Sequence, residues 1–263
     1  MFNFFQKASK YLRNIIALNT DDIFLVSFPK SGNTWVRFYL CNLINNIPEY
    51  HFTDSGVDFK TLDTIMPELG KSNLTKPWPF KGFPRIIKTH LGYKPFFSKC
   101  RSVLVVRDPR DVMVSYFKFE MTKNETKFAG NNITKFIRHP KMGIESWCRH
   151  YLSWKRKTGI IIKYEDVKCR DEEIFRNMND FLGIKVRDEI FLNAVEQSRF
   201  ENIKKMESLK GLADPSKGGT EFKFARSGKT GQWKEMFSED DLTYIKNTLQ
   251  RFSICLYGEV FHD

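Results

Sequence analysis

The sequence predicts an α/β fold: a single domain with a central parallel β-sheet flanked by helices. Four short apolar runs have the length and composition of buried parallel strands, near residues 22–28, 85–89, 102–107 and 159–164. Helical patterns of apolar residues follow several of these runs, as in a sheet covered on both faces. The length of 263 residues lies at the upper end for one hydrophobic core, so we expect one domain over residues 1–263.

Three segments of this domain differ in character. Residues 22–237 carry the motifs described below, and residues 238–263 are expected to form a C-terminal helix and tail. Residues 1–20 predict an amphipathic helix whose apolar face combines Phe4, Phe5, Ala8, Tyr11, Leu12, Ile15 and Ile16. Core packing is the preferred explanation of that face, and a helix lying on a membrane surface is the alternative.

The net charge of the chain indicates which classes of ligand it binds. The net charge of +12 attracts anions such as a phosphorylated cofactor. Nucleic acid is the rival interpretation, but the basic residues are interspersed with acids and no zinc, RRM or KH signature occurs, so we expect no nucleic-acid partner.

Cysteine usage and hydropathy indicate the compartment. The five cysteines are odd in number and lack a C-x-x-C pair, which favours reduced thiols in the cytoplasm. No apolar run reaches the roughly 18–20 residues of a membrane span. We expect no cleavable signal peptide, because Gln6, Lys7, Lys10 and Arg13 interrupt the N-terminal apolar residues. We therefore expect a cytoplasmic protein without stable membrane insertion.

The turn after the first strand predicts a phosphate site. It reads Ser27-Phe28-Pro29-Lys30-Ser31-Gly32-Asn33-Thr34-Trp35 and leads directly into an apolar helix. Strand, small-residue turn and helix together aim backbone N–H groups and the positive end of a helix dipole at one point. Lys30 and the hydroxyls of Ser31 and Thr34 converge there, so the expected guest is a phosphate. A tight strand–helix connection without a ligand is the bland alternative.

An ATP-binding Walker loop fits this turn less well. Walker loops read G-x-x-x-x-G-K-[ST], with Lys directly after the second Gly. Here Lys30 precedes the only glycine, Gly32. A G-K-T triplet does occur at residues 228–230, but it follows no apolar strand.

The second strand ends in Lys88-Thr89-His90. A lone histidine is more often structural than catalytic. However, functional groups of doubly wound sheets gather at the carboxyl ends of strands, which is where His90 lies. His150, in an aromatic helix with Trp147, Tyr151 and Trp154, is expected to be a packed core residue.

The third strand leads into Arg107-Asp108-Pro109-Arg110-Asp111. Asp108 as N-cap and Pro109 at the first helical position predict a helix start, and Asp111 is interpreted as a second capping group. Arg107 at the strand end can make a bidentate contact to a phosphate. Ser115 can face the same side of the site, two turns into the helix.

These segments together resemble the cytosolic-type sulfotransferases that use 3′-phosphoadenosine 5′-phosphosulfate (PAPS). The turn at 27–35 resembles their 5′-phosphosulfate loop, and Lys88-Thr89-His90-Leu91 resembles the segment with the catalytic base. Residues 107–115 resemble their 3′-phosphate segment, and the stretches ending at Tyr164-Glu165-Asp166 and Phe200 resemble their adenine-binding segments.

The resemblance implies a P-loop-like fold and specific roles. His90, Lys30 and Lys88 are the implied catalytic residues. The implied cofactor-binding residues are Lys30, Ser31, Gly32, Asn33, Thr34, Trp35, Arg107, Ser115, Tyr164, Ser198, Phe200, Arg226, Ser227 and Gly228. No metal site is expected, since lysines would supply the charge that Mg²⁺ supplies in kinases.

The late segment from Phe224 to Lys234 departs from the family pattern at two positions. Ser227 stands where the family has Lys, and Gln232 stands where it has Asp. The first departure removes one positive charge, for which Lys229 could compensate. The family's dimer element after Trp233 is not matched either, so a homodimer is possible but its pairing mode is open.

The implied function is transfer of a sulfuryl group from PAPS to a hydroxyl or amine of a small-molecule acceptor, with His90 as base. An ATP-dependent P-loop kinase and a non-catalytic nucleotide-binding protein are the alternatives. Residues 49–84 and 120–142 are expected to form the acceptor pocket, the latter as a mobile excursion. Whether the aromatics at 78, 80 and 83 line that pocket or only pack is left open.

Overall fold

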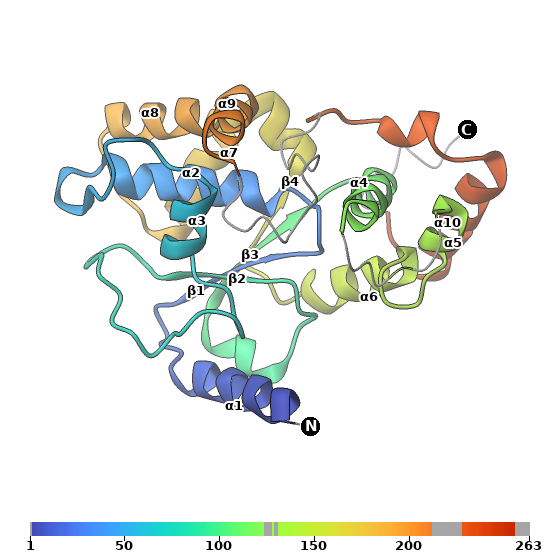
Figure 1. Cartoon of the computed structure of the whole chain (residues 1–263), viewed down its shortest axis with the longest axis horizontal. Coiled ribbons are helices and arrows are strands. Elements are labelled where there is room, and N and C mark those ends of the chain that lie inside the picture. The colour runs from blue at the N-terminus through green and yellow to red at the C-terminus, as the bar shows by residue number, and fades with distance from the viewer. Residues whose placement is uncertain (1, 124–127, 129–130, 212–227, 256–263) are drawn as a thin grey trace.

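The computed structural model describes residues 2–123, 128, 131–211 and 228–255. A four-stranded sheet lies at its centre, with all strands parallel and in the order β2-β1-β3-β4 (Figure 1). The strands are β1 (Ile23–Ser27), β2 (Ile86–Thr89), β3 (Arg101–Val106) and β4 (Ile160–Lys163). All four predicted strands are confirmed within one or two residues.

Helices cover both faces of the sheet. The longer ones are α1 (Phe2–Ile16), α2 (Asn33–Asn46), α4 (Pro109–Met121), α6 (Ile144–Trp154), α7 (Tyr164–Leu182), α8 (Asp188–Ser198), α9 (Phe200–Lys210) and α10 (Glu239–Arg251). The shorter ones are α3 (Phe59–Ile65), α5 (Ile133–Ile137) and the 3₁₀ turns Pro48–Tyr50, Pro95–Lys99 and Gln232–Glu235.

The alternation of side chains along the strands divides the core into two layers. Leu25 and Val105 point to the face covered by α2, α3, α7, α8 and α9. Phe24 and Leu104 point to the opposite face, covered by α4, α5, α6 and α10 (Figure 1). Because both faces are covered, the strands are apolar along most of their length. These apolar runs are the pattern from which the strands were predicted.

Two expectations about the segments around this core are wrong. Residues 133–137 are not part of a mobile excursion: they form α5, whose Phe136 and Ile137 are fully buried. The apolar face of α1 is not wholly packed either, since Leu12 and Ile16 are 58% and 75% exposed. The helix is attached through Tyr11, which packs against Phe96, and through the buried amide of Asn14, which donates to the carbonyl of Ser72 (2.9 Å).

The aromatics in the segment 49–84 serve packing. Phe80 and Phe83 are buried in the core layer of α2, and the indole N–H of Trp78 donates to the carbonyl of Phe83 (2.7 Å). Among the described residues, no helix has the length and apolar character needed to traverse a membrane.

Candidate active site

The loops that follow β1, β2 and β3 come together at one end of the sheet. β1 and β3 are neighbours, yet α2 after β1 and α4 after β3 pack on opposite faces. In sheets of this kind, the carboxyl ends of two strands whose helices diverge in this way are the usual ligand site. Lys30 follows β1 and Arg107 follows β3, so the topology places both predicted phosphate ligands at this end of the two strands.

The turn after β1 has an unusual backbone. Lys30 has a φ of 69° and Gly32 a φ of 98°, both in the left-handed region. A Cβ atom on Gly32 would lie 2.5 Å from the ring of Tyr164, the first residue of α7. The chain therefore needs a glycine here twice over, for its backbone angle and for the approach of the tyrosine ring. The next residue, Asn33, begins α2 and Thr34 lies in its first turn.

Three buried donors around this turn have no hydrogen-bond partner among the described residues: the hydroxyl of Ser31, the indole N–H of Trp35 and the Nε–H of Arg107. Buried donors are normally satisfied, and each one left without a partner costs about 1–3 kcal/mol. A phosphorylated nucleotide offers acceptors for donors of this kind. The residues present thus fit the expected ligand.

Arg107 is fixed in place by several contacts. Its guanidinium donates to the carbonyl of Lys229 (3.0 Å), lies 3.6 Å from the carboxylate of Asp111 and sits over the ring of Tyr164, 4.5 Å from the ring centre. Asp111 also accepts the backbone N–H of Gly231 (2.8 Å). The interpretation of Asp111 as a helix cap is wrong: this buried carboxylate ties the late loop to Arg107. Asp108 is the N-cap, as predicted, and accepts the N–H of Arg110 (2.9 Å).

The predicted adenine-binding residues surround the same loop from the other side. The hydroxyl of Tyr164 donates to the carbonyl of Gly228 (3.3 Å), and a Cβ atom on Gly228 would lie 2.9 Å from the ring of Phe200. Trp35 packs edge-on to Tyr164, with ring centres 5.7 Å apart. Ser198 is fully buried and its hydroxyl donates to the carbonyl of Val195 (2.8 Å).

The structure shows little about the remaining residues predicted to bind the 3′-phosphate. Ser115 is partly buried on α4, and Arg226 and Ser227 lie outside the described residues. Sequence reasoning missed Lys168, whose ammonium donates to the carbonyl of Gly228 (2.9 Å). No spacing rule singles out this lysine, because it lies on the exposed face of α7.

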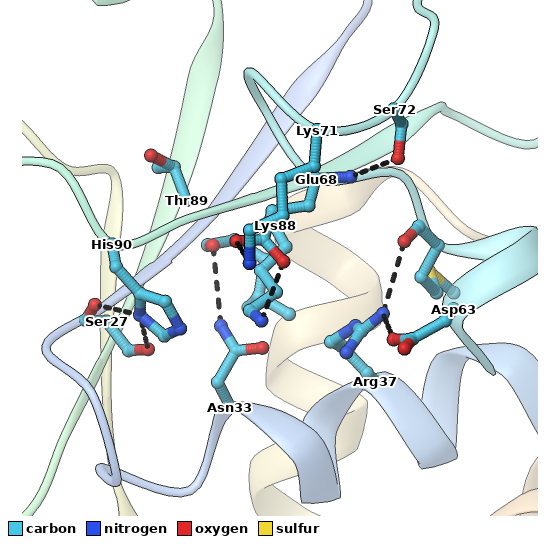
Figure 2. Close-up of polar contacts among 12 residues, drawn as sticks. Ser27, Asn33, Arg37, Asp63, Glu68, Lys71, Ser72, Lys88, Thr89 and His90 are labelled. Carbon is cyan, nitrogen blue, oxygen red and sulfur yellow. Dashed lines mark hydrogen bonds and ion pairs between the residues drawn. The ribbon is translucent and has the colours of Figure 1, made fainter. Parts of the chain in front are cut away.

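His90 lies just beyond β2 in a defined tautomer. Its Nδ1 atom is 2.7 Å from the backbone carbonyl oxygen of Ser27 and 3.3 Å from the hydroxyl of the same residue (Figure 2). A carbonyl oxygen can only accept, so Nδ1 carries the proton and Nε2 carries the lone pair. Burial and the positive charge of Lys88 lower the pKa of His90 to about 3, so the imidazole is neutral at pH 7.

Lys88 and Lys30 have different partners. The ammonium of Lys88 lies 3.1 Å from the carboxylate of Glu68 (Figure 2), and that of Lys30 lies 4.5 Å from the ring centre of Phe119. Sequence reasoning missed Glu68 because its segment shows no periodicity. It also did not foresee that the buried His150 lies close enough to His90 for its charge to influence the pKa of His90.

Comparison with known proteins identifies the arrangement. Residues 20–258 match the family described as the sulfotransferase domain. The chain belongs to this sulfotransferase family. Sulfotransferase 6B1 of Danio rerio is 30% identical over 236 residues, which cover 83% of this chain and 74% of that protein. Sulfotransferase 6B1 of Homo sapiens is 30% identical over 255 residues, covering 90% of this chain and 77% of that protein.

Solved sulfotransferase-like structures share the fold. Mouse sulfotransferase SULT7A1 complexed with PAP superimposes with a TM-score of 0.68 at 22% identity, covering 97% of this chain and 94% of that one. Retinol dehydratase in complex with androsterone and the inactive cofactor PAP gives a TM-score of 0.66 at 18% identity, with coverages of 93% and 85%. The α/β prediction with a P-loop-like turn is confirmed, and the chain is an enzyme of the sulfotransferase class.

Proposed function

We propose that this sulfotransferase moves the sulfuryl group of PAPS to a hydroxyl or amine of a small-molecule acceptor, with His90 as the base. The observation that carries the proposal is the tautomer of His90. Its Nδ1–H is committed to the Ser27 carbonyl, and its Nε2 atom makes no hydrogen bond within the part of the chain that is described. A neutral imidazole with a lone pair at the carboxyl end of the sheet, where the phosphate ligands are proposed to lie, can take the acceptor's proton.

The low pKa of His90 is compatible with this role. A base of such low pKa is weak; burial is the larger cause of this low pKa, and the positive charge of Lys88 is the second. An anion bound at Lys88 would offset that charge and raise the pKa of His90 toward its ordinary value. The imidazole would thus stay unprotonated before the donor binds and become more basic afterwards.

The donor supplies an activated sulfuryl group on a bisphosphate leaving group. Lys30 and Lys88 would bind the sulfuryl oxygens and balance charge on the leaving group, each contributing roughly 10²–10³ in rate. The turn residues Ser31, Gly32, Asn33 and Thr34 would hold the 5′ side. The 3′-phosphate would be held by Arg107, Ser115, Arg226, Ser227 and Gly228, and the adenine by Trp35, Tyr164, Ser198 and Phe200.

The proposed acceptor is a small soluble alcohol, phenol or amine, with a larger glycan or lipid as the alternative. From the sequence we further propose a cytoplasmic location, a single domain over residues 1–263 and no nucleic-acid partner. SULT7A1 and retinol dehydratase were crystallised with PAP, which supports the same nucleotide for this chain.

Calorimetry with adenosine 3′,5′-bisphosphate, ADP and ATP, with and without Mg²⁺, tests the donor. We expect metal-independent binding of the bisphosphate and a loss of at least about tenfold in affinity in Arg107→Ala, because one charged contact to the 3′-phosphate disappears. Preference for ATP with Mg²⁺ would instead support a P-loop kinase.

The role of His90 is tested separately. His90→Ala should bind the bisphosphate within about twofold of wild type and lose PAPS turnover by roughly 10²–10⁴ with a panel of phenols, alcohols and amines. His51→Ala is the matched control, since His51 lies on the surface and pairs with Asp54. Parallel loss of binding and turnover in His90→Ala would show that His90 only supports the fold of the site.

A further inference from the structure

We infer that Glu68 is a positioning residue for Lys88: it holds the lysine ammonium beside His90 and keeps it charged until the sulfuryl group replaces Glu68 as its partner. The inference rests on the proposed function, because it assumes that Lys88 binds the sulfuryl oxygens. Glu68 itself lies in the segment between α3 and β2, which was predicted to contribute to the acceptor pocket but not to the chemical step.

The backbone fixes Glu68 opposite Lys88. Residues 67–69 lie along the outer side of β2 as an isolated parallel bridge that pairs Glu68 with Lys88. The Lys88 N–H donates to the Pro67 carbonyl (2.8 Å), and the Leu69 N–H donates to the Lys88 carbonyl (2.9 Å). The Glu68 N–H in turn donates to the Ser72 hydroxyl (2.9 Å), which closes the turn (Figure 2). The two side chains are therefore held together by main-chain bonds and not by chance surface proximity.

The carboxylate of Glu68 is shared between two lysines. One oxygen lies 3.1 Å from the ammonium of Lys88, and the other lies 2.7 Å from that of Lys71. The two lysines differ in exposure: the Lys88 side chain is 16% exposed and the Lys71 side chain 69%. If Lys88 turns to another anion, Lys71 remains on Glu68, so no buried carboxylate is left without a counter-charge. This arrangement suits a lysine that changes partners.

The charges around Lys88 show why it needs Glu68. Arg37 from α2, Lys71 from the adjoining turn and His90 from beyond β2 face it as cationic or potentially cationic groups. Glu68 is the ion-pair partner of Lys88 itself, while Asp63 from α3 pairs with Arg37 (3.1 Å). Burial, followed by the charge of Arg37, lowers the pKa of Lys88 to about 8 even with Glu68 in place. Removal of Glu68 would lower this pKa further, so the ammonium would lose its proton near neutral pH.

The first test measures the pH at which Lys88 loses its proton, in the absence of any nucleotide. Competitive labelling of lysines with acetic anhydride across pH 6–10, read by mass spectrometry, gives the pH at which Lys88 becomes reactive. We expect that midpoint to fall in Glu68→Gln. Lys71→Met is the matched control: it removes a like charge from the same carboxylate, so the midpoint should stay or rise. An unchanged midpoint in Glu68→Gln would overturn the inference.

The second test asks whether the charged ammonium of Lys88 contributes to binding of the sulfuryl group. Calorimetry with PAPS and with adenosine 3′,5′-bisphosphate separates contacts to the sulfuryl oxygens from contacts to the rest of the nucleotide. At pH 8 we expect Glu68→Gln to lose about tenfold in affinity for PAPS relative to the bisphosphate. Lys88→Arg in the Glu68→Gln background should restore the preference, because a guanidinium stays charged.

The outcomes separate the two hypotheses. Failure of the wild-type protein to bind PAPS would remove the proposed function, whatever the labelling shows. If the wild-type protein binds PAPS and Glu68→Gln keeps the same ratio of affinities for PAPS and the bisphosphate, only the role assigned to Glu68 is removed.

Discussion

At the scale of single residues, the site depends on backbone angles that few side chains tolerate. Lys30 is one of the two non-glycine residues with positive φ in the described part of the chain, and it lies in the turn that is proposed to bind the sulfuryl group. Residues in this region are strained and persist where the surroundings determine them, often at functional sites. Gly32, two positions later, adds a close ring contact to the same backbone demand.

Replacing Gly32 separates these two costs. Gly183 lies at the C-terminal end of α7 with a φ of 71° and open space around it, so Gly183→Ala should lower the free energy of unfolding only by the backbone strain of about 1 kcal/mol. Gly32→Ala should lower it by the same strain and by roughly 1–3 kcal/mol more, because its methyl group meets the Tyr164 ring. Urea unfolding of both variants measures the difference. Equal destabilisation would mean that the ring moves aside freely.

At the scale of elements, a buried ion pair joins the starts of two strands to α1. Arg85 donates to both carboxylate oxygens of Asp22 (2.8 and 2.6 Å) and to the carbonyls of Leu74 (2.7 Å) and Ala17 (2.9 Å). The guanidinium thus links the residue before β1, the loop at Leu74 and the residue after α1, at the amino ends of the strands. The pair lies at the end of the sheet opposite the proposed site, so we expect a structural role for it.

Asp22→Asn tests this link. The substitution leaves the buried Arg85 without its counter-charge, which should lower the free energy of unfolding by about 3–5 kcal/mol. Asp21→Asn, at the exposed neighbouring position, should change it by less than about 0.5 kcal/mol. Affinity for adenosine 3′,5′-bisphosphate in the surviving folded fraction should be unchanged, and a large loss of that affinity would contradict a purely structural role.

At the scale of the whole molecule, the buried His150 and the half-buried His90 couple stability to pH. Burial lowers the pKa of His90 to about 3 and that of His150 to about 4, while an unfolded histidine titrates near 6.5. Because the folded-state pKa values are the lower ones, the stabilisation is present above pH 6.5. It is lost as the pH falls and the unfolded chain takes up protons. His51 acts in the opposite direction, since its hydrogen bond to Asp54 raises its pKa, but it is exposed.

The free energy of unfolding should therefore fall between pH 7 and pH 5. For each of these two histidines, the loss should amount to about 2 kcal/mol. Denaturant titrations at both pH values measure the slope, and His150→Phe should reduce it by about half. A slope that His150→Phe leaves unchanged would show that His150 is protonated in the folded protein.

The sequence predicts what local pattern controls. The four strands, the N-cap at Asp108 and the helix end at Gly183 each follow from a few adjacent residues, and the structure confirms them. The partners of Asp111 and Lys88 could not be predicted in this way, because each depends on a segment that reaches the site from elsewhere in the chain. Exposure of Leu12 and Ile16 was missed for a related reason: an amphipathic pattern does not state how much of its apolar face finds a partner.

The short bridge at residues 67–69 has a second consequence. β2 is the outermost strand on its side of the sheet, and such a strand presents unpaired backbone groups on which another chain can add itself. The bridge occupies two of these groups at Lys88. The stretch that places Glu68 thus also shields an edge that would otherwise invite aggregation. Insertions or deletions here should lower the yield of soluble protein as well as alter catalysis.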